Sequence, residues 1–219
     1  SVVSYTSTDV AGATVGHGLN AVMDFAIFKN RDRAQNWLVY HKSLDITSGE
    51  AINLNQTAAA YASAAQFNST LATSSVFTLG TGGNASNAAG DDIIAFCFAS
   101  VEGYSAFGTY EGTGLASTAP FVYTGMRPRW ILVKNRDDGT SAADWFIYDT
   151  SRSTFNAVDD QLYPNRGNAE ASSSTHAFDI LSNGFRVRST STSALSNKSG
   201  NTYIWAAFAE HPFKTARAR

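Results

Sequence analysis

The chain has 219 residues, of which 43% are apolar and 12% aromatic, so it is long enough to bury one large core or two smaller ones. Only 16% of the residues are charged, against about 25% in a typical globular protein, and the formal net charge is −2. This balance provides no electrostatic footprint for nucleic acid or an anionic membrane, and we expect neither as a partner. No stretch approaches the roughly 20 apolar residues of a spanning helix, so we expect no membrane insertion.

The first half of the chain predicts strands where short apolar runs lie between clusters of Gly, Asn, Asp and Ser. These runs are Val2 to Thr6, Phe25 to Lys29, Trp37 to Tyr40, Ser75 to Leu79, and Ile93 to Ser100. Ala58 to Ala65 is rich in helix formers but too short to be stable alone. We expect a single turn of helix or a loop there.

The second half predicts a similar series of strands. They are Gly108 to Tyr110, Phe121 to Tyr123, Trp130 to Lys134, Trp145 to Tyr148, Phe185 to Ser189, and Tyr203 to Ala209. Their spacing suits antiparallel sheets rather than βαβ units. The connections Gly80 to Gly90 and Ser189 to Gly200 precede the last strand of each half, and we expect both to be exposed and tolerant of sequence change.

The same pattern of residues occurs twice along the chain. Phe25 to Tyr40 reads FAIFKNRDRAQNWLVY and Trp130 to Tyr148 reads WILVKNRDDGTSAADWFIY, so Lys-Asn-Arg-Asp and a later Trp-x-x-Tyr recur in the same order. The distance between the copies grows slowly, which indicates small loop insertions in the second copy. We therefore predict an all-β protein of two tandem, similar halves, residues 1–106 and 107–219, each antiparallel and β-sandwich-like (jelly-roll-like).

Large apolar residues that both halves keep are expected to form the cores. The matched pairs are Trp37 with Trp145, Tyr40 with Tyr148, Phe77 with Phe185, Ile94 with Ile204, and Phe98 with Phe208. Because both copies keep these scaffold positions, we expect function where the copies differ. Those segments are residues 45–75, 80–90, 153–176 and 189–200.

The repeated Lys-Asn-Arg-Asp has two interpretations. In the first, Asn and Asp form a hairpin bend and the basic residues keep a sheet edge soluble. In the second, the two copies are equivalent polar sites for a saccharide or for an inter-subunit contact. The basic residues concerned are Lys29, Arg31, Lys134 and Arg136.

Motifs for catalysis and metal binding are incomplete. The four histidines, His17, His41, His176 and His211, lack the spacing of a zinc site. Asn135, Asp137 and Asp138 place oxygens in a turn but stop short of a calcium loop. The acidic residues Glu50, Glu102, Glu111, Asp144, Glu170 and Glu210 are scattered, so the sequence identifies no glycosidase pair. We predict no catalytic residue, no cofactor and no metal, in a protein that is not an enzyme.

Several segments, taken in order, resemble a known phage module. They are Lys29-Asn30-Arg31, NWLVYHKSL from Asn36, FVYTGMRP from Phe121, LSNGF from Leu181, and AFAEHPFK from Ala207. In this order they are similar to a module of tail fibre and other structural proteins of tailed bacteriophages. The resemblance implies a virion component at the tail or capsid exterior that is concerned with host-surface recognition, usually trimeric and not an enzyme. It carries no defined binding residues.

We therefore expect a tail fibre or receptor-binding module that contacts other virion proteins, attaches to a host glycan or protein, and forms a homo-oligomer, with a trimer as our prediction. One alternative is a capsid decoration or tail accessory subunit. A second is a polysaccharide depolymerase, which would need converging carboxylates. We expect receptor contacts at Tyr61, Asn68, Tyr163 and Arg166, because they lie outside the predicted strands in polar surroundings.

Overall fold

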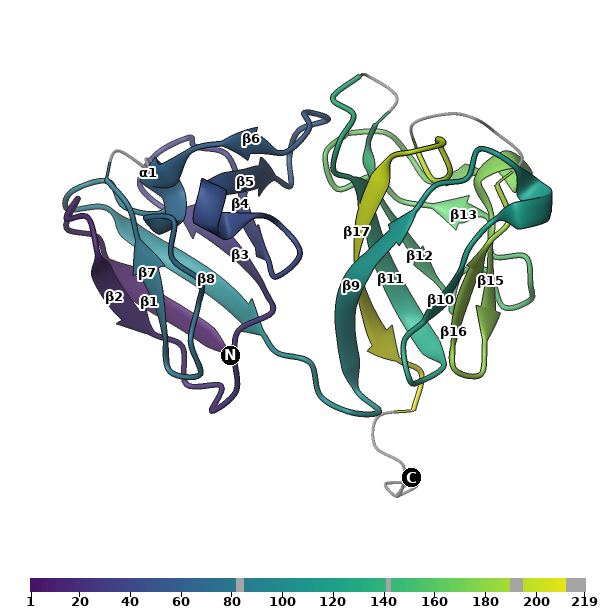
Figure 1. Ribbon diagram of the computed structural model, residues 1–219, viewed down its shortest axis with the longest axis horizontal. Coiled ribbons are helices and arrows are strands. Elements are labelled where there is room, and N and C mark those ends of the chain that lie inside the picture. Colours follow the sequence, from purple (N-terminus) through teal and green to yellow (C-terminus); the bar gives the residue numbers. More distant parts are fainter. Residues whose placement is uncertain (82–84, 141–142, 190–194, 212–219) are drawn as a thin grey trace. The chain divides into compact units, whose positions relative to one another are not determined.

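The computed structural model describes residues 1–81, 85–140, 143–189 and 195–211, and most of its regular structure is antiparallel β-sheet (Figure 1). The chain divides into two compact units. Unit 1 comprises Ser1–Gln56 and Ala60–Ala99, and unit 2 comprises Thr57–Ala59 and Ser100–Arg219. Within the described ranges, no helix is both long and apolar enough to span a membrane.

Unit 1 has one large and one small antiparallel sheet. The large sheet contains, in spatial order, β1 (Val2–Thr6), β8 (Asp92–Phe98), β3 (Phe25–Asn30), β4 (Leu38–His41), β5 (Glu50–Asn53) and β6 (Tyr61–Ala62). The small sheet pairs β2 (Ala13–Gly16) with β7 (Val76–Leu79). The helical segments of this unit are the single turns α1 (Ala64–Phe67) and η1 (Ile46–Ser48).

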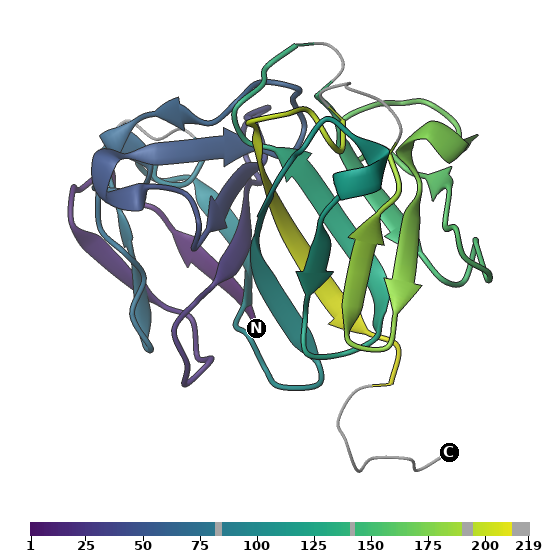
Figure 2. The same cartoon turned by 45° about the vertical axis from the view of Figure 1, so that its right-hand side comes forward.

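Unit 2 has a similar arrangement, but its larger sheet has four strands and its smaller sheet has three. Its four-stranded sheet contains, in spatial order, β12 (Trp145–Asp149), β11 (Pro128–Asn135), β17 (Thr202–Ala209) and β9 (Ser105–Glu111). Its three-stranded sheet contains β10 (Phe121–Tyr123), β16 (Gly184–Val187) and β15 (Phe178–Leu181), which lie side by side in Figure 2. A short pair, β13 (Asp160–Gln161) and β14 (Ala171–Ser172), and the turns η2 (Ala116–Thr118) and η3 (Ser174–His176) complete the unit.

Strand order and register repeat between the units. The order β1-β8-β3-β4 in unit 1 corresponds to β9-β17-β11-β12 in unit 2, and the pair β2-β7 corresponds to β10-β16. The register agrees as well, because Val15 lies opposite Phe77 in unit 1 and Val122 lies opposite Phe185 in unit 2. This correspondence assigns each residue of one small sheet a counterpart in the other.

The predicted strands are confirmed, since each overlaps a strand of the structure. Within residues 58–65, where a single turn of helix or a loop was expected, Tyr61–Ala62 form β6 instead, and the helical turn α1 overlaps this range only at Ala64 and Ala65. The strands that were not predicted have two to four residues each; they are β2, β5, β6, β13, β14 and β15. The predicted boundary between residues 106 and 107 falls inside β9.

Aromatic side chains form the centre of each unit. In unit 1 the rings of Phe28 and Phe77 lie 5.0 Å apart between centroids, and in unit 2 the rings of Tyr148 and Phe178 lie 4.8 Å apart. Two of the predicted core pairs are confirmed in full, because both members are buried. These pairs are Tyr40 with Tyr148 and Phe77 with Phe185.

The other predicted core pairs hold only in part. Trp145 is fully buried, but Trp37 is 39% exposed, because it precedes β4 and lies beside the Lys29 ammonium, 5.8 Å from the ring centroid. Phe98 and Phe208 are half-buried rather than buried. Ile204 is buried, whereas its counterpart Ile94 is half-buried.

The expectation that the connections before β8 and β17 are exposed holds only at their ends, since Thr81, Ala89, Gly90, Ser199 and Gly200 are exposed but the residues between them that the structure describes are largely buried. Ser86 and Asn87 in the first, and Ser196 and Asn197 in the second, have no exposed surface. Residues 82–84 and 190–194 of these connections lie outside the described residues.

Candidate functional site

The repeated Lys-Asn-Arg-Asp forms a bend that fastens a hairpin to the neighbouring strand. In unit 1 the Asn30 side-chain oxygen accepts from the backbone N–H groups of Asp32 and Arg33, at 2.9 and 3.0 Å. The Asp32 carboxylate then accepts from the backbone N–H of Asp92, the first residue of β8, at 2.6 Å. Such local side-chain bonds define an Asx-type turn.

The second copy repeats these bonds in unit 2. The Asn135 side-chain oxygen accepts from the backbone N–H groups of Asp137 and Asp138, at 3.0 and 3.1 Å. The Asp137 carboxylate accepts from the backbone N–H of Thr202, the first residue of β17, at 2.6 Å. The prediction that Asn and Asp make the bend is confirmed, and these polar atoms are engaged within each unit rather than presented to a saccharide.

The prediction that the two lysines keep a sheet edge soluble is wrong. β11 lies between β12 and β17, and Lys134 is fully buried, with its ammonium donating to the carbonyl oxygens of Thr57, Asn135 and Ala143 at 2.8–2.9 Å. Burial lowers the pKa of Lys134 to about 8. Lys29 is half-buried and donates to the Gln35 carbonyl at 2.8 Å. Both lysines therefore serve as internal donors to loop carbonyls.

A buried asparagine before the last strand of each unit forms a second set of hydrogen bonds to backbone groups of other segments. We call such a set a tie. The Asn87 oxygen accepts from the backbone N–H groups of Thr8 and Asp9, and its amide donates to Val10 and Gly80. These bonds explain why the connection is buried. It holds the chain that follows β1 against the chain that follows β7.

Unit 2 contains the matching tie. The Asn197 oxygen accepts from the backbone N–H of Thr113 at 2.8 Å, and its amide donates to the Leu115 carbonyl at 3.3 Å. The serine before each asparagine accepts at its carbonyl oxygen from a tyrosine hydroxyl, that of Tyr5 in unit 1 and Tyr110 in unit 2. Ser-Asn-x-x-Gly, present in both connections, is the sequence signal that would have identified this tie.

The four residues predicted as receptor contacts fall in different surroundings. In unit 1, Tyr61 is half-buried in β6, and Asn68 is exposed at the left-handed end of α1 with a φ of 51°. In unit 2, Tyr163 is half-buried against the core and its hydroxyl donates to Gln161 at 2.6 Å. The guanidinium carbon of Arg166 lies 6.0 Å from the Tyr163 ring centroid, so the structure brings these two residues together.

Arg166 is also part of an internal tie. It pairs with the buried carboxylate of Asp144 at 2.5 Å, and the same carboxylate oxygen accepts from the Asn165 amide at 2.6 Å. Asn165 in turn accepts from the backbone N–H of Trp145 at 3.0 Å. In unit 1 Asn55 accepts from the backbone N–H of Trp37 at 2.9 Å. Arg166 therefore extends a backbone tie that both units contain.

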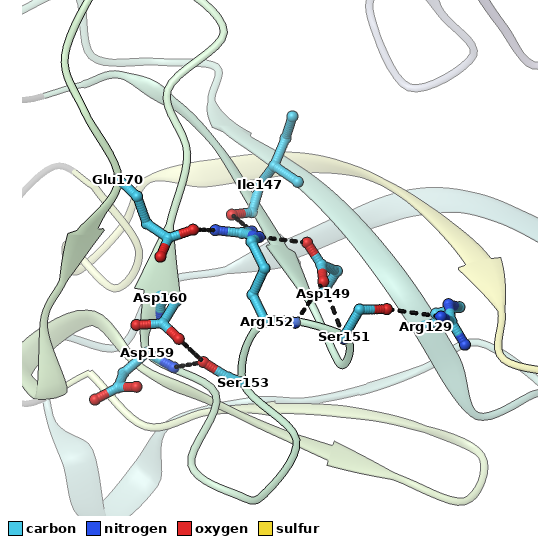
Figure 3. A network of polar contacts seen from close by, with 9 residues as sticks. All are labelled: Arg129, Ile147, Asp149, Ser151, Arg152, Ser153, Asp159, Asp160 and Glu170. Carbon is cyan, nitrogen blue, oxygen red and sulfur yellow. Dashed lines mark hydrogen bonds and ion pairs between the residues drawn. The ribbon is translucent and has the colours of Figure 1, made fainter.

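The carboxylates of unit 2 lie largely in arginine pairs, and Figure 3 shows one network of them. Arg152 bridges Asp149 at 2.6 Å and Glu170 at 2.8 Å, while the Ser153 hydroxyl donates to Asp160. Burial raises the pKa of Asp149, but the hydrogen bonds and charge of Arg152 outweigh it, so that pKa lies below its ordinary value. Across the described ranges, no three His, Cys, Asp or Glu side chains form a group suited to a metal ion.

The acidic turn after Asn135 likewise contains an ion pair. Asp138 is buried and pairs with the ammonium of Lys198, whose side chain is 45% exposed. The hydrogen bond from Lys198, together with one from the backbone N–H of Thr140, lowers the pKa of Asp138 to about 2. These bonds engage the oxygens that resembled part of a calcium loop.

The pKa of Asp138 predicts a loss of stability in acid. Because its folded value of about 2 lies below its ordinary 3.8, the stabilisation is present above pH 3.8 and is lost as the pH falls towards 2. Partial solvation of Lys198 limits the effect to about 1–2 kcal/mol. The difference in unfolding free energy between the wild type and Asp138→Asn, measured by urea denaturation from pH 6 to pH 2.5, is expected to shrink over this window. A difference that is independent of pH would contradict the assignment.

The exposed face of the β10–β16–β15 sheet is where the units differ most clearly at the surface. Phe121 is 48% and Tyr123 68% exposed, and they lie on one face of β10 because they flank the buried Val122. Pairing places Phe121 opposite Arg186 and Tyr123 opposite Gly184. We call this surface the aromatic face. The sequence predicted the strand but not the face, because register is needed to see it.

The corresponding face of unit 1 has no aromatic side chain and no charge. Thr14 and Gly16 occupy the positions of Phe121 and Tyr123, and they lie opposite Thr78 and Val76 on β7. The comparison isolates three residues that unit 2 adds to a shared framework. They are Phe121, Tyr123 and Arg186.

Glycines shape the aromatic face. A β carbon on Gly184 would lie 3.0 Å from the Phe121 ring and 2.1 Å from the Val122 carbonyl oxygen, so the ring of Phe121 leans over a position with no side chain. A β carbon on Gly125 would lie 3.7 Å from the Tyr123 hydroxyl. The two rings therefore rest against backbone and leave their other surfaces to solvent.

Comparison with known proteins gives a family. A family model described as "Domain of unknown function (DUF7483)" matches residues 1–212. No curated protein and no solved structure matches the chain. The matched range spans both units, and it includes the paired ties as well as the aromatic face.

Proposed function

The chain belongs to the family of the domain of unknown function DUF7483, and we propose that it is a virion component of a tailed bacteriophage, a tail fibre or receptor-binding module that attaches to a carbohydrate on the host surface. The proposal places it at the exterior of the particle, in contact with other virion proteins and as a homotrimer, as the resemblance to tail fibre modules implies. Neither catalysis nor a cofactor is part of this proposal.

The observation that supports attachment is the aromatic face. Exposed aromatic groups that gather on one surface mark interaction sites more often than scattered apolar residues do. Phenylalanine and tyrosine rings provide flat apolar area, and tyrosine adds a hydroxyl that can hydrogen-bond. Such rings suit the apolar C–H face of a sugar ring, while the flanking polar groups suit its hydroxyls. The face occurs on only one of two otherwise similar small sheets, as expected for a function added to a scaffold.

For the scaffold we propose two β-sandwich-like halves of jelly-roll character. Rings from the small and large sheets pack against each other in both units, with 5.0 Å between Phe77 of β7 and Phe28 of β3 and 5.7 Å between Phe185 of β16 and Trp205 of β17. These contacts support two sheets sharing a core within each unit. In such a sandwich, the outer surface of the small sheet of unit 2 is the aromatic face.

The depolymerase alternative receives less support from the geometry. Three of the acidic residues considered for catalysis form arginine pairs, namely Asp144, Glu170 and Glu210. A fourth, Glu50, accepts from the backbone N–H of Asp45 at 2.6 Å. A decoration or accessory subunit would instead use the aromatic face to bind another virion protein, and the binding experiment below distinguishes these roles.

The test is binding of the purified full chain to host cells and to immobilised glycans. We expect Phe121→Thr/Tyr123→Thr to weaken binding about tenfold or more, because two ring contacts are lost. Threonine is the residue that unit 1 carries opposite Thr78, so the sheet tolerates it on this face. Leu115→Thr is the control, since Leu115 is 59% exposed in unit 2 outside the sheet.

Two outcomes would contradict the proposal. One is glycan binding that the double variant leaves unchanged, which would move the site elsewhere. The other is the absence of binding to any glycan or host cell, combined with tight binding to purified virions that lack this chain. That second result would favour the decoration or accessory role.

A further inference from the structure

We propose that the aromatic face recognises an acidic saccharide, with Arg186 binding the carboxylate of a uronic acid whose sugar ring lies against Phe121 and Tyr123. The inference rests on the proposed function, because it assigns a chemical class to the carbohydrate bound there. It depends on the position and the charge of Arg186.

Arg186 occupies the middle of the face. β16 lies between β10 and β15, and Arg186 lies opposite Phe121 on one side and Asp179 on the other. The residue is half-buried and pairs across the strands with Phe121, so its positive charge is less fully solvated than that of an exposed arginine. A cation in such surroundings interacts more strongly with an incoming anion than a fully solvated one does.

The guanidinium of Arg186 has no ligand of its own. Among the described residues it makes no hydrogen bond and no ion pair, although a carboxylate is directly opposite. That carboxylate, Asp179, pairs instead with Arg188 at 3.1 Å. The nearby Arg127 pairs with Glu210 at 2.6 Å and also donates to the Ile180 carbonyl on β15. The face therefore retains one uncompensated positive charge, located at Arg186.

The chemistry of the three side chains matches a uronic acid. An arginine fork binds a planar carboxylate through two parallel hydrogen bonds, with stronger geometric selection than lysine provides. The rings of Phe121 and Tyr123 offer apolar surface within the same face. A uronic acid carries a carboxylate at the edge of a pyranose ring and apolar C–H groups on its faces, so one sugar unit satisfies both kinds of contact.

Unit 1 shows how the framework looks without this site. The position of Arg186 is occupied by Thr78 and that of Phe121 by Thr14, within the same antiparallel pairing. Replacing Arg186 by threonine therefore installs a residue that the sheet already accommodates at this position. This provides a variant that tests charge recognition while keeping the backbone arrangement.

The experiment begins with the full chain on a glycan array that contains neutral, sulfated and uronate-bearing oligosaccharides. We expect the tightest binders to carry uronic acid. The best binder is then compared with its methyl ester by calorimetry, and esterification is expected to weaken binding about tenfold or more. Arg186→Thr is expected to weaken binding of the free acid to the same extent and to abolish the preference over the ester.

Two further variants make the result specific. Arg186→Lys keeps the charge without the fork and is expected to give intermediate affinity for the acid. Arg31→Thr removes one positive charge from an exposed residue of unit 1 and is expected to leave binding unchanged. This control separates local recognition from the net charge of the chain.

The outcomes distinguish failure of this inference from failure of the proposed function. Tight binding to neutral or sulfated glycans, lost in Phe121→Thr/Tyr123→Thr but not in Arg186→Thr, would overturn the uronate assignment and keep the attachment role. An acid preference that persists in Arg186→Thr would also overturn it. Absence of binding to every glycan would remove the attachment role itself.

Discussion

Lys134→Met is expected to lower the free energy of unfolding of unit 2 by about 3 kcal/mol, and Lys29→Met to lower that of unit 1 by less than about 1 kcal/mol. Methionine preserves most of the side-chain volume but cannot donate. The carbonyl oxygens of Thr57, Asn135 and Ala143 would each lose a hydrogen bond from the Lys134 ammonium. A buried acceptor without a donor costs about 1–3 kcal/mol, and relief of cation desolvation offsets part of the sum.

The measurement is urea denaturation of the full chain followed by tryptophan fluorescence. Trp130, Trp145 and Trp205 report on unit 2, whereas Trp37 is in unit 1, so a Trp37→Phe background assigns the transition. Lys29→Met is the matched control, because Lys29 occupies the equivalent position but is half-buried. Equal losses in the two variants would show that burial does not distinguish the lysines.

Alkaline pH provides a second test of Lys134. Its pKa is about 8 in the folded chain, below the ordinary 10.5, so between these values the unfolded state binds more protons. Stability contributed by this group therefore rises with pH from about 8 towards 10.5. The gap between the wild type and Lys134→Met is expected to widen between pH 7.5 and pH 9.5. A constant gap would contradict the lowered pKa.

Asn197→Ala and Asn87→Ala are expected to lower the unfolding free energy of their own units by about 2–4 kcal/mol each. Both side chains are fully buried. Asn87 joins backbone groups at Asp9 and Gly80, and Asn197 joins its own connection to the backbone of Thr113 and Leu115. Removal leaves buried N–H and C=O groups without partners and opens a cavity.

The effects are also expected to be local to each unit. Hydrogen exchange should show lost protection around Thr113 in Asn197→Ala and around Asp9 in Asn87→Ala, with the other unit unchanged. Asn183→Ala is the control, because Asn183 is exposed in the turn before β16. A loss below about 0.5 kcal/mol for either buried asparagine, within the range of ordinary surface substitutions, would show that water replaces its bonds.

The sequence predicts the strands where a long apolar run is enough to define them. β17, for example, spans Thr202–Ala209 where Tyr203 to Ala209 was predicted, and the hairpins around the two Lys-Asn-Arg-Asp bends are present. The two-residue strands β13 and β14 were not predicted because their pairing depends on tertiary position rather than on composition. The burial of Lys134 was missed for a similar reason, because the sequence does not show whether the strand that contains this lysine lies at the edge or in the interior of a sheet.

The candidate site was less accessible to prediction than the fold. Phe121 and Tyr123 could be placed in a strand, but their common exposure depends on Val122 facing Phe185, and the role of Arg186 depends on register between strands distant in sequence. Tyr163 and Arg166 were correctly placed outside strands, yet their partners Gln161 and Asp144 could not be read from the chain. Side-chain contacts of this kind can be identified only from the three-dimensional structure.

The aromatic face also bears on how such a chain can evolve. Substitution of Gly184 is not tolerated, because a β carbon there would collide with the Val122 carbonyl. Asn87 and Asn197 are constrained as well, because buried backbone groups depend on their hydrogen bonds. The rings of Phe121 and Tyr123, by contrast, point away from the core, and unit 1 folds with threonine and glycine in their places. Under the proposed attachment role, substitutions at these outward positions would alter which ligand is bound while leaving the fold intact.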